Sequence, residues 1–145
     1  MELYRIWIPL LLLALQPQPV FACGYCVEDR IAATYDFAVV SHALDQRHKV
    51  AFFAIQGGLA ARGISSESIS GLLEGTRGID RNSVRVSVDS ESLSFAFDPS
   101  RTLLAPIVNA VDAKLGAKGL SLAPLRVLDS TSYAKPEPGA RNASR

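Results

Sequence analysis

The chain has only two cysteines, and their spacing makes them its strongest candidates for chemistry. Cys23 and Cys26 are separated by two residues, and the other 143 positions contain no cysteine. Two thiolates at this spacing can converge on a soft metal ion such as Cu(I) or Zn²⁺. A free amine at Cys23 would add a nitrogen donor. We therefore take Cys23 and Cys26 as the candidate metal ligands, with Cu(I) or another soft metal as the ion.

Two further interpretations of the pair stay open. A Cys-x-x-Cys at a helix N-terminus can exchange disulfides, because the helix dipole acidifies the first thiol. The tetrapeptide Cys-Gly-Tyr-Cys resembles the active-site motif of periplasmic disulfide isomerases of thioredoxin fold, although no strand is predicted directly before it here. The other interpretation is a local disulfide between Cys23 and Cys26, on a module that acts by binding another protein. All three interpretations depend on the same two sulfur atoms.

The two histidines are not expected to complete this site. His42 would lie about 24 Å from the cysteines along a straight helix that rises 1.5 Å per residue. We predict that His42 and His48 are surface or helix-end residues.

Residues 1–22 have the pattern of a secretory signal peptide. Arg5 precedes an apolar run over residues 6–15, and the segment ends with a Val-x-Ala motif at Ala22. The run is shorter than the ~20 residues that span a bilayer. We predict cleavage after Ala22, which makes Cys23 the first residue of a periplasmic or secreted protein without a transmembrane segment. The same junction loosely resembles a bacterial lipoprotein box, in which Cys23 would carry a lipid anchor instead of a metal.

The composition excludes several classes of function. With 15 Lys and Arg against 14 Asp and Glu, the net charge of +1 gives no reason to expect a nucleic-acid partner. The chain contains no nucleophile elbow, phosphate-binding loop or His-Glu-x-x-His motif, so no catalytic chemistry is indicated apart from thiol–disulfide exchange, and a non-enzymatic role is favoured. The partner that we expect is another exported or membrane protein.

The first half of the mature chain is predicted to form a helix, a strand and a second helix. Apolar residues recur every three or four positions through residues 23–48, as in an amphipathic helix. Residues 49–55 are apolar on both faces, which is typical of a central strand. A helix then begins at Ser65 or Ser66 and ends before Gly75.

The second half is predicted to form a hairpin, a helix and an edge strand. Residues 83–88 and 92–97 alternate between polar and apolar types and should pair. The sequence Asp98-Pro99 is typical of a helix start and places Leu103 on the buried face of that helix. Pro124 confines the last strand, residues 120–129, to a sheet edge.

These elements together predict the fold class. A helix followed by β-α-β-β-α-β indicates an α+β protein, in which a ferredoxin-like antiparallel sheet occupies residues 49–129 and an additional N-terminal helix occupies residues 23–48. Right-handed crossovers place the strands that begin at Lys49 and Ser92 in the middle of the sheet. The N-terminal helix is expected on the free face or across an edge, and residues 130–145 are expected to form a disordered tail.

Residues 49–129 resemble a known family. The segment 78–86, followed by Phe-Ala-Phe-Asp-Pro and a helix, is similar to the second half of heavy-metal-associated domains, the copper chaperone-like ferredoxin folds. The resemblance implies metal binding through a Cys-x-x-Cys in the loop after the first strand. Here that loop, residues 56–63, has no cysteine, histidine or methionine. A metal-binding role therefore requires a relocated site at Cys23 and Cys26.

Overall fold

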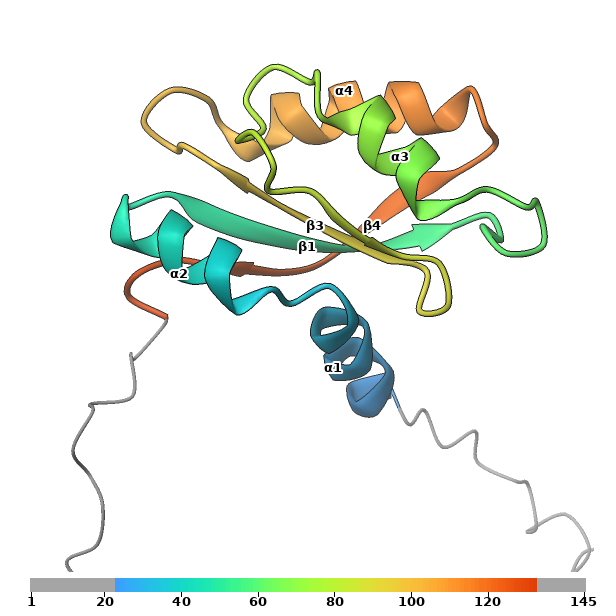
Figure 1. Ribbon diagram of the computed structural model, residues 1–145, viewed down its shortest axis with the longest axis horizontal. Helices are drawn as coiled ribbons and strands as arrows, with labels where there is room; N and C mark the ends of the chain where they lie inside the picture. The colour runs from blue at the N-terminus through green and yellow to red at the C-terminus, as the bar shows by residue number, and fades with distance from the viewer. Residues whose placement is uncertain (1–22, 133–145) are drawn as a thin grey trace, which may run out of the picture.

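The computed structural model describes residues 23–132, so the predicted signal peptide and residues 133–145 of the predicted tail lie outside the described residues. The described chain contains one four-stranded sheet in the order β2-β3-β1-β4, with every neighbouring pair antiparallel (Figure 1). Its strands are β1 (Lys49–Gln56), β2 (Arg85–Ser87), β3 (Ser92–Phe97) and β4 (Ser121–Leu128). This order confirms the predicted ferredoxin-like fold, with β1 and β3 in the centre.

Four helices cover the two faces of the sheet in pairs. One face carries α3 (Ser66–Leu73) and α4 (Leu104–Gly116), which are the crossover helices of the ferredoxin-like unit. The opposite face carries α1 (Cys23–Ala33) and α2 (Phe37–Asp45) (Figure 1). Helices on both faces explain why nearly all of β1 and all of β3 are buried.

Two separate clusters of apolar side chains form the core. The first lies between the sheet and α3 and α4, and includes Phe53, Phe95 and Phe97. The second lies between the sheet and α1 and α2, where Phe52 packs with Ile31. Successive side chains of a strand point to opposite faces, so the neighbouring residues Phe52 and Phe53 belong to different clusters.

The N-terminal helical segment differs from the prediction, because it consists of two helices instead of one. The chain leaves α1 after Ala33, and Asp36 adopts an extended conformation from which its carboxylate accepts hydrogen bonds from the amides of Ala38 and Val39. An aspartate in this arrangement is a strong N-cap and starts a new helix. The periodic apolar pattern continues across the break, which is why spacing alone did not reveal it.

The start of α4 also differs from the prediction. The carboxylate of Asp98 caps only a turn, by accepting hydrogen bonds from the amide and hydroxyl of Ser100, and α4 begins five residues beyond Pro99. Pro106 explains the shift, because a proline is tolerated in the first turn of a helix but breaks its interior. Leu103 consequently precedes the helix and is 72% exposed, so its predicted burial is wrong.

One edge strand of the sheet pairs irregularly with its neighbour, and the other edge strand is short. β4 forms one edge, as Pro124 predicts, and its pairing with β1 contains an irregularity between Phe52 and Phe53. The other edge, β2, is only three residues long and is shorter than predicted. Within residues 23–132, no helix is both long and apolar enough to cross a membrane.

Candidate functional site

The cysteine pair lies at the N-terminus of α1. Cys23 and Cys26 are the first and fourth residues of this helix. A helix brings residues three apart in sequence to the same side. The positive end of the helix dipole also favours negative groups such as thiolates. The local backbone is therefore compatible with each of the three interpretations of the pair.

The residues that follow the pair attach α1 to the sheet. Val27 and Ile31 pack against the second core cluster, and Glu28 forms an ion pair with Arg126 on β4. At the end of the helix, the hydroxyl of Ser94 donates a 2.8 Å hydrogen bond to the carbonyl oxygen of Thr34. The helix is thus anchored beyond the cysteine turn.

This attachment places α1 near the end of β1. Asp29 and Arg30 share a surface hollow of about 330 Å³ with Ala60 and with the turn that joins β2 to β3. Ala60 belongs to the loop that follows β1. α1 therefore lies beside the end of the sheet where β1 leads into this loop.

The loop itself is closed by contacts within the protein. Arg62 donates a 2.7 Å hydrogen bond from Nε to the carbonyl oxygen of Gly57, and the amide of Leu59 donates to a carboxylate oxygen of Glu91 at 3.0 Å. Gly57 has a φ of 115°, and a Cβ there would lie 2.5 Å from the carbonyl oxygen of Gly119. An arginine and a buried leucine thus hold a loop that has no metal ligand.

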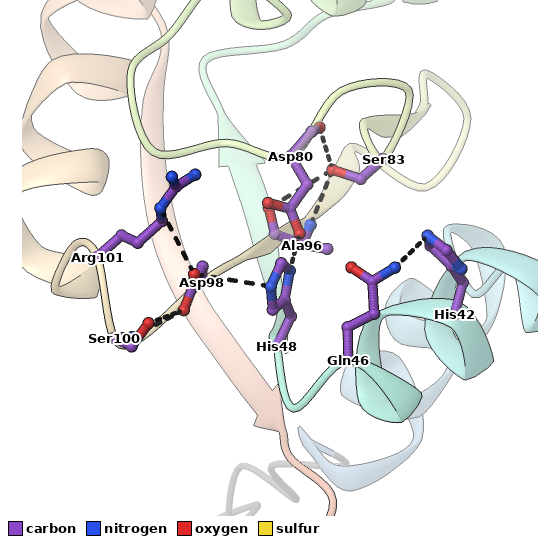
Figure 2. A network of polar contacts seen from close by, with 9 residues as sticks. All are labelled: His42, Gln46, His48, Asp80, Ser83, Ala96, Asp98, Ser100 and Arg101. Carbon is purple, nitrogen blue, oxygen red and sulfur yellow. Dashed lines mark hydrogen bonds and ion pairs between the residues drawn. The ribbon is translucent and has the colours of Figure 1, made fainter.

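A second polar cluster surrounds His48, at the opposite end of β1 (Figure 2). Its Nδ1 lies 2.6 Å from a carboxylate oxygen of Asp80, and its Nε2 lies 3.8 Å from one of Asp98. The side chain of His48 is only 20% exposed. His48 lies just after α2, where its amide donates a 2.8 Å hydrogen bond to the carbonyl oxygen of Ala43, as the helix-end prediction requires. The prediction did not include the two aspartates that hold its side chain.

His42 fits its prediction. It is exposed on α2, and its Nε2 lies 3.0 Å from the side-chain amide nitrogen of Gln46 one turn later.

Backbone contacts hold Asp80 in place against His48. The amide of Asp80 donates to the carbonyl oxygen of Ala96 at 2.9 Å. The hydroxyl of Ser83 donates to the carbonyl oxygen of Asp80 and accepts from the amide of Ala96, at 2.7 and 3.0 Å (Figure 2). These contacts join the loop before β2 to the central strand β3, so the aspartate has a fixed position.

Asp98 is kept ionised by its own surroundings. Hydrogen bonds from the hydroxyl and the amide of Ser100 lower the pKa of the Asp98 carboxyl, and the charges of Arg101 and of His48 in its imidazolium form lower it further. Sequence reasoning missed this cluster because Asp80 and Asp98 are 32 and 50 positions from His48, with no motif to link them. The sequence marked His48 only as a histidine and Asp98 only as part of a helix start.

The described part of the chain contains no group of three or more His, Cys, Asp or Glu residues arranged to hold a metal ion.

Comparisons with known proteins find similar structures but no similar sequence. No family model and no curated protein matches this chain. Similar solved structures include a copper-binding domain of HMA7, a P-type ATPase, with 18% identity, a TM-score of 0.42, and coverage of 55% of this chain and 96% of that domain. Oxidized MerP from Ralstonia metallidurans CH34 shares 11% identity over 55% of this chain and 99% of its own, with a TM-score of 0.42.

A third similar structure is the N-terminal domain of a potential copper-translocating P-type ATPase from Bacillus subtilis in the Cu(I)-loaded state. It shares 22% identity, with a TM-score of 0.43, over 57% of this chain and 94% of that domain. Two of these three proteins are described as binding or translocating copper. The likeness is loose, and the ferredoxin-like fold of this chain is established by its own strand order.

Proposed function

We propose that this protein is an exported carrier that binds a soft metal ion, such as Cu(I), through the thiolates of Cys23 and Cys26. The ion is cargo, which the protein delivers to, or senses for, another exported or membrane protein. The observation that carries the proposal is the position of both cysteines in the first turn of α1. Two thiolates are sufficient ligands for Cu(I), a soft ion that thiolates select.

The position of α1 supports transfer to a partner. The cysteines begin a helix whose later residues, Val27 and Ile31, pack onto the sheet. Ligands in the first turn of an element that is anchored by its later residues can meet a partner without disturbing the core. The closed loop at residues 56–63 supports the same assignment, because it contains no residue type that binds soft ions.

Export is part of the proposal. Arg5, the apolar run over residues 6–15 and the Val-x-Ala ending at Ala22 support cleavage directly before Cys23. Cleavage there would give Cys23 a free amine and place both thiols in the periplasm or outside the cell. Acylation at the same position would instead make Cys23 a lipid anchor and leave Cys26 as the single thiol. The intact mass of the protein purified from its host distinguishes cleavage, acylation and a disulfide in one measurement.

Titration with Cu(I) tests metal binding. The reduced protein should take one Cu(I) from a chromogenic chelator, and a Cys23→Ser/Cys26→Ser variant should lose this ability. A His42→Gln/His48→Gln variant is the matched control and should retain it, because the histidines are not proposed ligands. Equal Cu(I) uptake by the cysteine variant and the unmodified protein would overturn the proposal.

Thiol–disulfide exchange is the second candidate function, because a Cys-x-x-Cys at a helix N-terminus favours a reactive first thiolate. Reduction of insulin or refolding of scrambled ribonuclease distinguishes it from metal binding. Turnover that is lost in the double serine variant, together with no competition for Cu(I), would favour exchange. If the protein shows neither Cu(I) binding nor thiol–disulfide exchange, the remaining interpretation is a structural disulfide on a partner-binding module.

A further inference from the structure

A cavity at the start of β1 has the properties of a second binding site. It encloses about 370 Å³ beside His48, where Lys49 at the start of β1 pairs with Phe97 at the end of β3. Its polar lining comes from the residue directly before β1 and from two loops that are distant in sequence. These residues are His48, Arg77, Asp80, Asp98, Arg101 and Thr102.

The two aspartates of the cavity already have partners. A carboxylate oxygen of Asp80 lies 2.6 Å from Nδ1 of His48. One oxygen of Asp98 accepts two hydrogen bonds from Ser100, at 2.6 Å from the hydroxyl and 2.9 Å from the amide. Both carboxylates are therefore held in place as parts of the cavity wall.

The cationic groups of the cavity are less well paired. Among the described residues, Arg77 has no hydrogen-bond or ion-pair partner. Arg101 has an 84% exposed side chain, and its Nε lies 3.9 Å from Asp98, too far for a hydrogen bond. Nε2 of His48 lies 3.8 Å from the same carboxylate oxygen (Figure 2). Three nitrogen-bearing groups thus surround one cavity without filling their hydrogen-bonding capacity.

The protonation of His48 decides the charge of this cavity. A carboxylate only accepts hydrogen bonds, so Nδ1 of His48 carries the proton that faces Asp80. In the neutral ring Nε2 is then an acceptor, and it becomes a donor only in the imidazolium form. The two arginines balance the two aspartates, so the imidazolium would supply the net positive charge. His42 and Arg81 line only the neighbouring cavity on the other side of His48.

We propose that this cavity binds a small oxyanion, a carboxylate or a phosphate-type group, and that binding is coupled to protonation of His48. Arg77 and Arg101 provide planar donors that match such oxygens, and the imidazolium donates from Nε2. Asp80 orients the ring, as a carboxylate orients a ligand histidine. The site is independent of the cysteine pair, which lies on another element, α1.

Titration with two anions tests the proposal. Sulfate represents a tetrahedral oxyanion and oxalate a dicarboxylate, and neither changes its charge between pH 6 and 8. Binding is followed by the NMR signals of the arginine side chains and the histidine rings, at constant ionic strength with chloride. We expect saturation with a dissociation constant on the order of 1 mM, and about tenfold tighter binding near pH 6 than near pH 8. The tighter anion identifies the chemical source of the ligand.

Matched variants make the test specific. Arg77→Met and Arg101→Met should each weaken binding about tenfold, the usual size for a lost charge-assisted hydrogen bond. Arg81→Met should have no effect. His48→Gln should remove the pH dependence, whereas His42→Gln should preserve it. Circular dichroism shows whether each variant is folded. If His48→Gln does not fold, the variants of the exposed residues Arg77 and Arg101 still test anion binding.

Three outcomes would overturn the proposal. The first is no saturation at tens of millimolar of either anion, and the second is an equal loss of affinity in Arg81→Met and Arg77→Met. The third is a pH dependence that survives in His48→Gln and disappears in His42→Gln.

Discussion

The two faces of the sheet are covered by helices in different ways. Beneath α3 and α4, three phenylalanine rings stack or meet edge to face, with centroids 5.4 Å apart for Phe53 and Phe95 and 6.5 Å apart for Phe95 and Phe97. Beneath α1 and α2, the apolar cluster is smaller and lies beside buried hydroxyl groups. These belong to Thr34, Ser92 and Ser94.

The difference assigns separate roles to the two faces. Stability rises with the apolar area that is removed from water, so the face under α3 and α4 forms the stable body of the fold. The other face holds α1 through a few apolar contacts, one ion pair and one hydrogen bond from Ser94. Elements with few buried contacts open first in native proteins. The candidate ligands are therefore carried by the element that we expect to open most easily.

The largest expected effect is in the body of the fold. Phe95→Ala should lower the free energy of unfolding by about 3–5 kcal/mol, because it removes a fully buried ring and leaves a cavity. Urea denaturation measures the change. Phe37→Ala is the matched control, since that ring is 64% exposed and its loss should change stability by less than about 0.5 kcal/mol. Similar losses in both variants would contradict the assignment of the body.

A smaller and more local effect is expected under α1. Ile31→Ala should cost about 2 kcal/mol, because Ile31 is the buried aliphatic anchor of this helix. Amide hydrogen exchange should become faster in α1 and stay nearly unchanged in β1 and β3. Uniform acceleration across the sheet would show that α1 unfolds only with the whole domain, against the proposed difference between the faces.

Two serines of β3 should respond with opposite signs. Among the described residues, the buried hydroxyl of Ser92 has no hydrogen-bond partner, whereas that of Ser94 donates to Thr34. Ser92→Ala should raise the free energy of unfolding by about 1 kcal/mol, because it removes an unsatisfied buried group. Ser94→Ala should lower it by about 1 kcal/mol. Thermal unfolding of the two variants measures this contrast. Changes in stability of the same sign in both variants would contradict the prediction.

The smallest expected effect concerns the partly buried contact between Asp36, the N-cap of α2, and Arg85 on β2. A hydrogen bond from Arg85, with one from the amide of Val39, lowers the pKa of Asp36 from its ordinary 3.8. A lowered pKa in the folded state contributes stability above the ordinary value, and this contribution is lost as the pH falls through the folded pKa. NMR titration should show the Asp36 midpoint rise in Arg85→Met. An unchanged midpoint would mean that the ion pair does not form in solution.

The sequence predicted most elements because their signals are local. The Ser65 cap, the alternation in β3 and the proline on β4 each depend on neighbouring residues, and the structure confirms all three. The errors arose where a second local signal competed. Asp36 interrupts an otherwise continuous helical pattern, and Pro106 delays a helix that Asp98-Pro99 alone would have started.

The candidate sites divide in the same way. Cys23 and Cys26 were found from type and spacing alone, since a two-residue separation already allows two sulfurs to approach one ion. The cluster around His48 had no such signal. Its partners come from the loop before β2 and from the end of β3, and they meet only because Lys49 pairs with Phe97 in the sheet.

The sequence by itself therefore determined the α+β fold class, the central strands and the position of the only thiols. The tertiary structure decided which faces the helices cover, how firmly α1 is held and which charged groups surround His48. The physical reason is the distance in sequence between the residues that interact. Secondary structure and residue spacing depend on contacts within a few positions, whereas the polar cavity depends on strand register, which brings together groups that are 32 and 50 residues from His48.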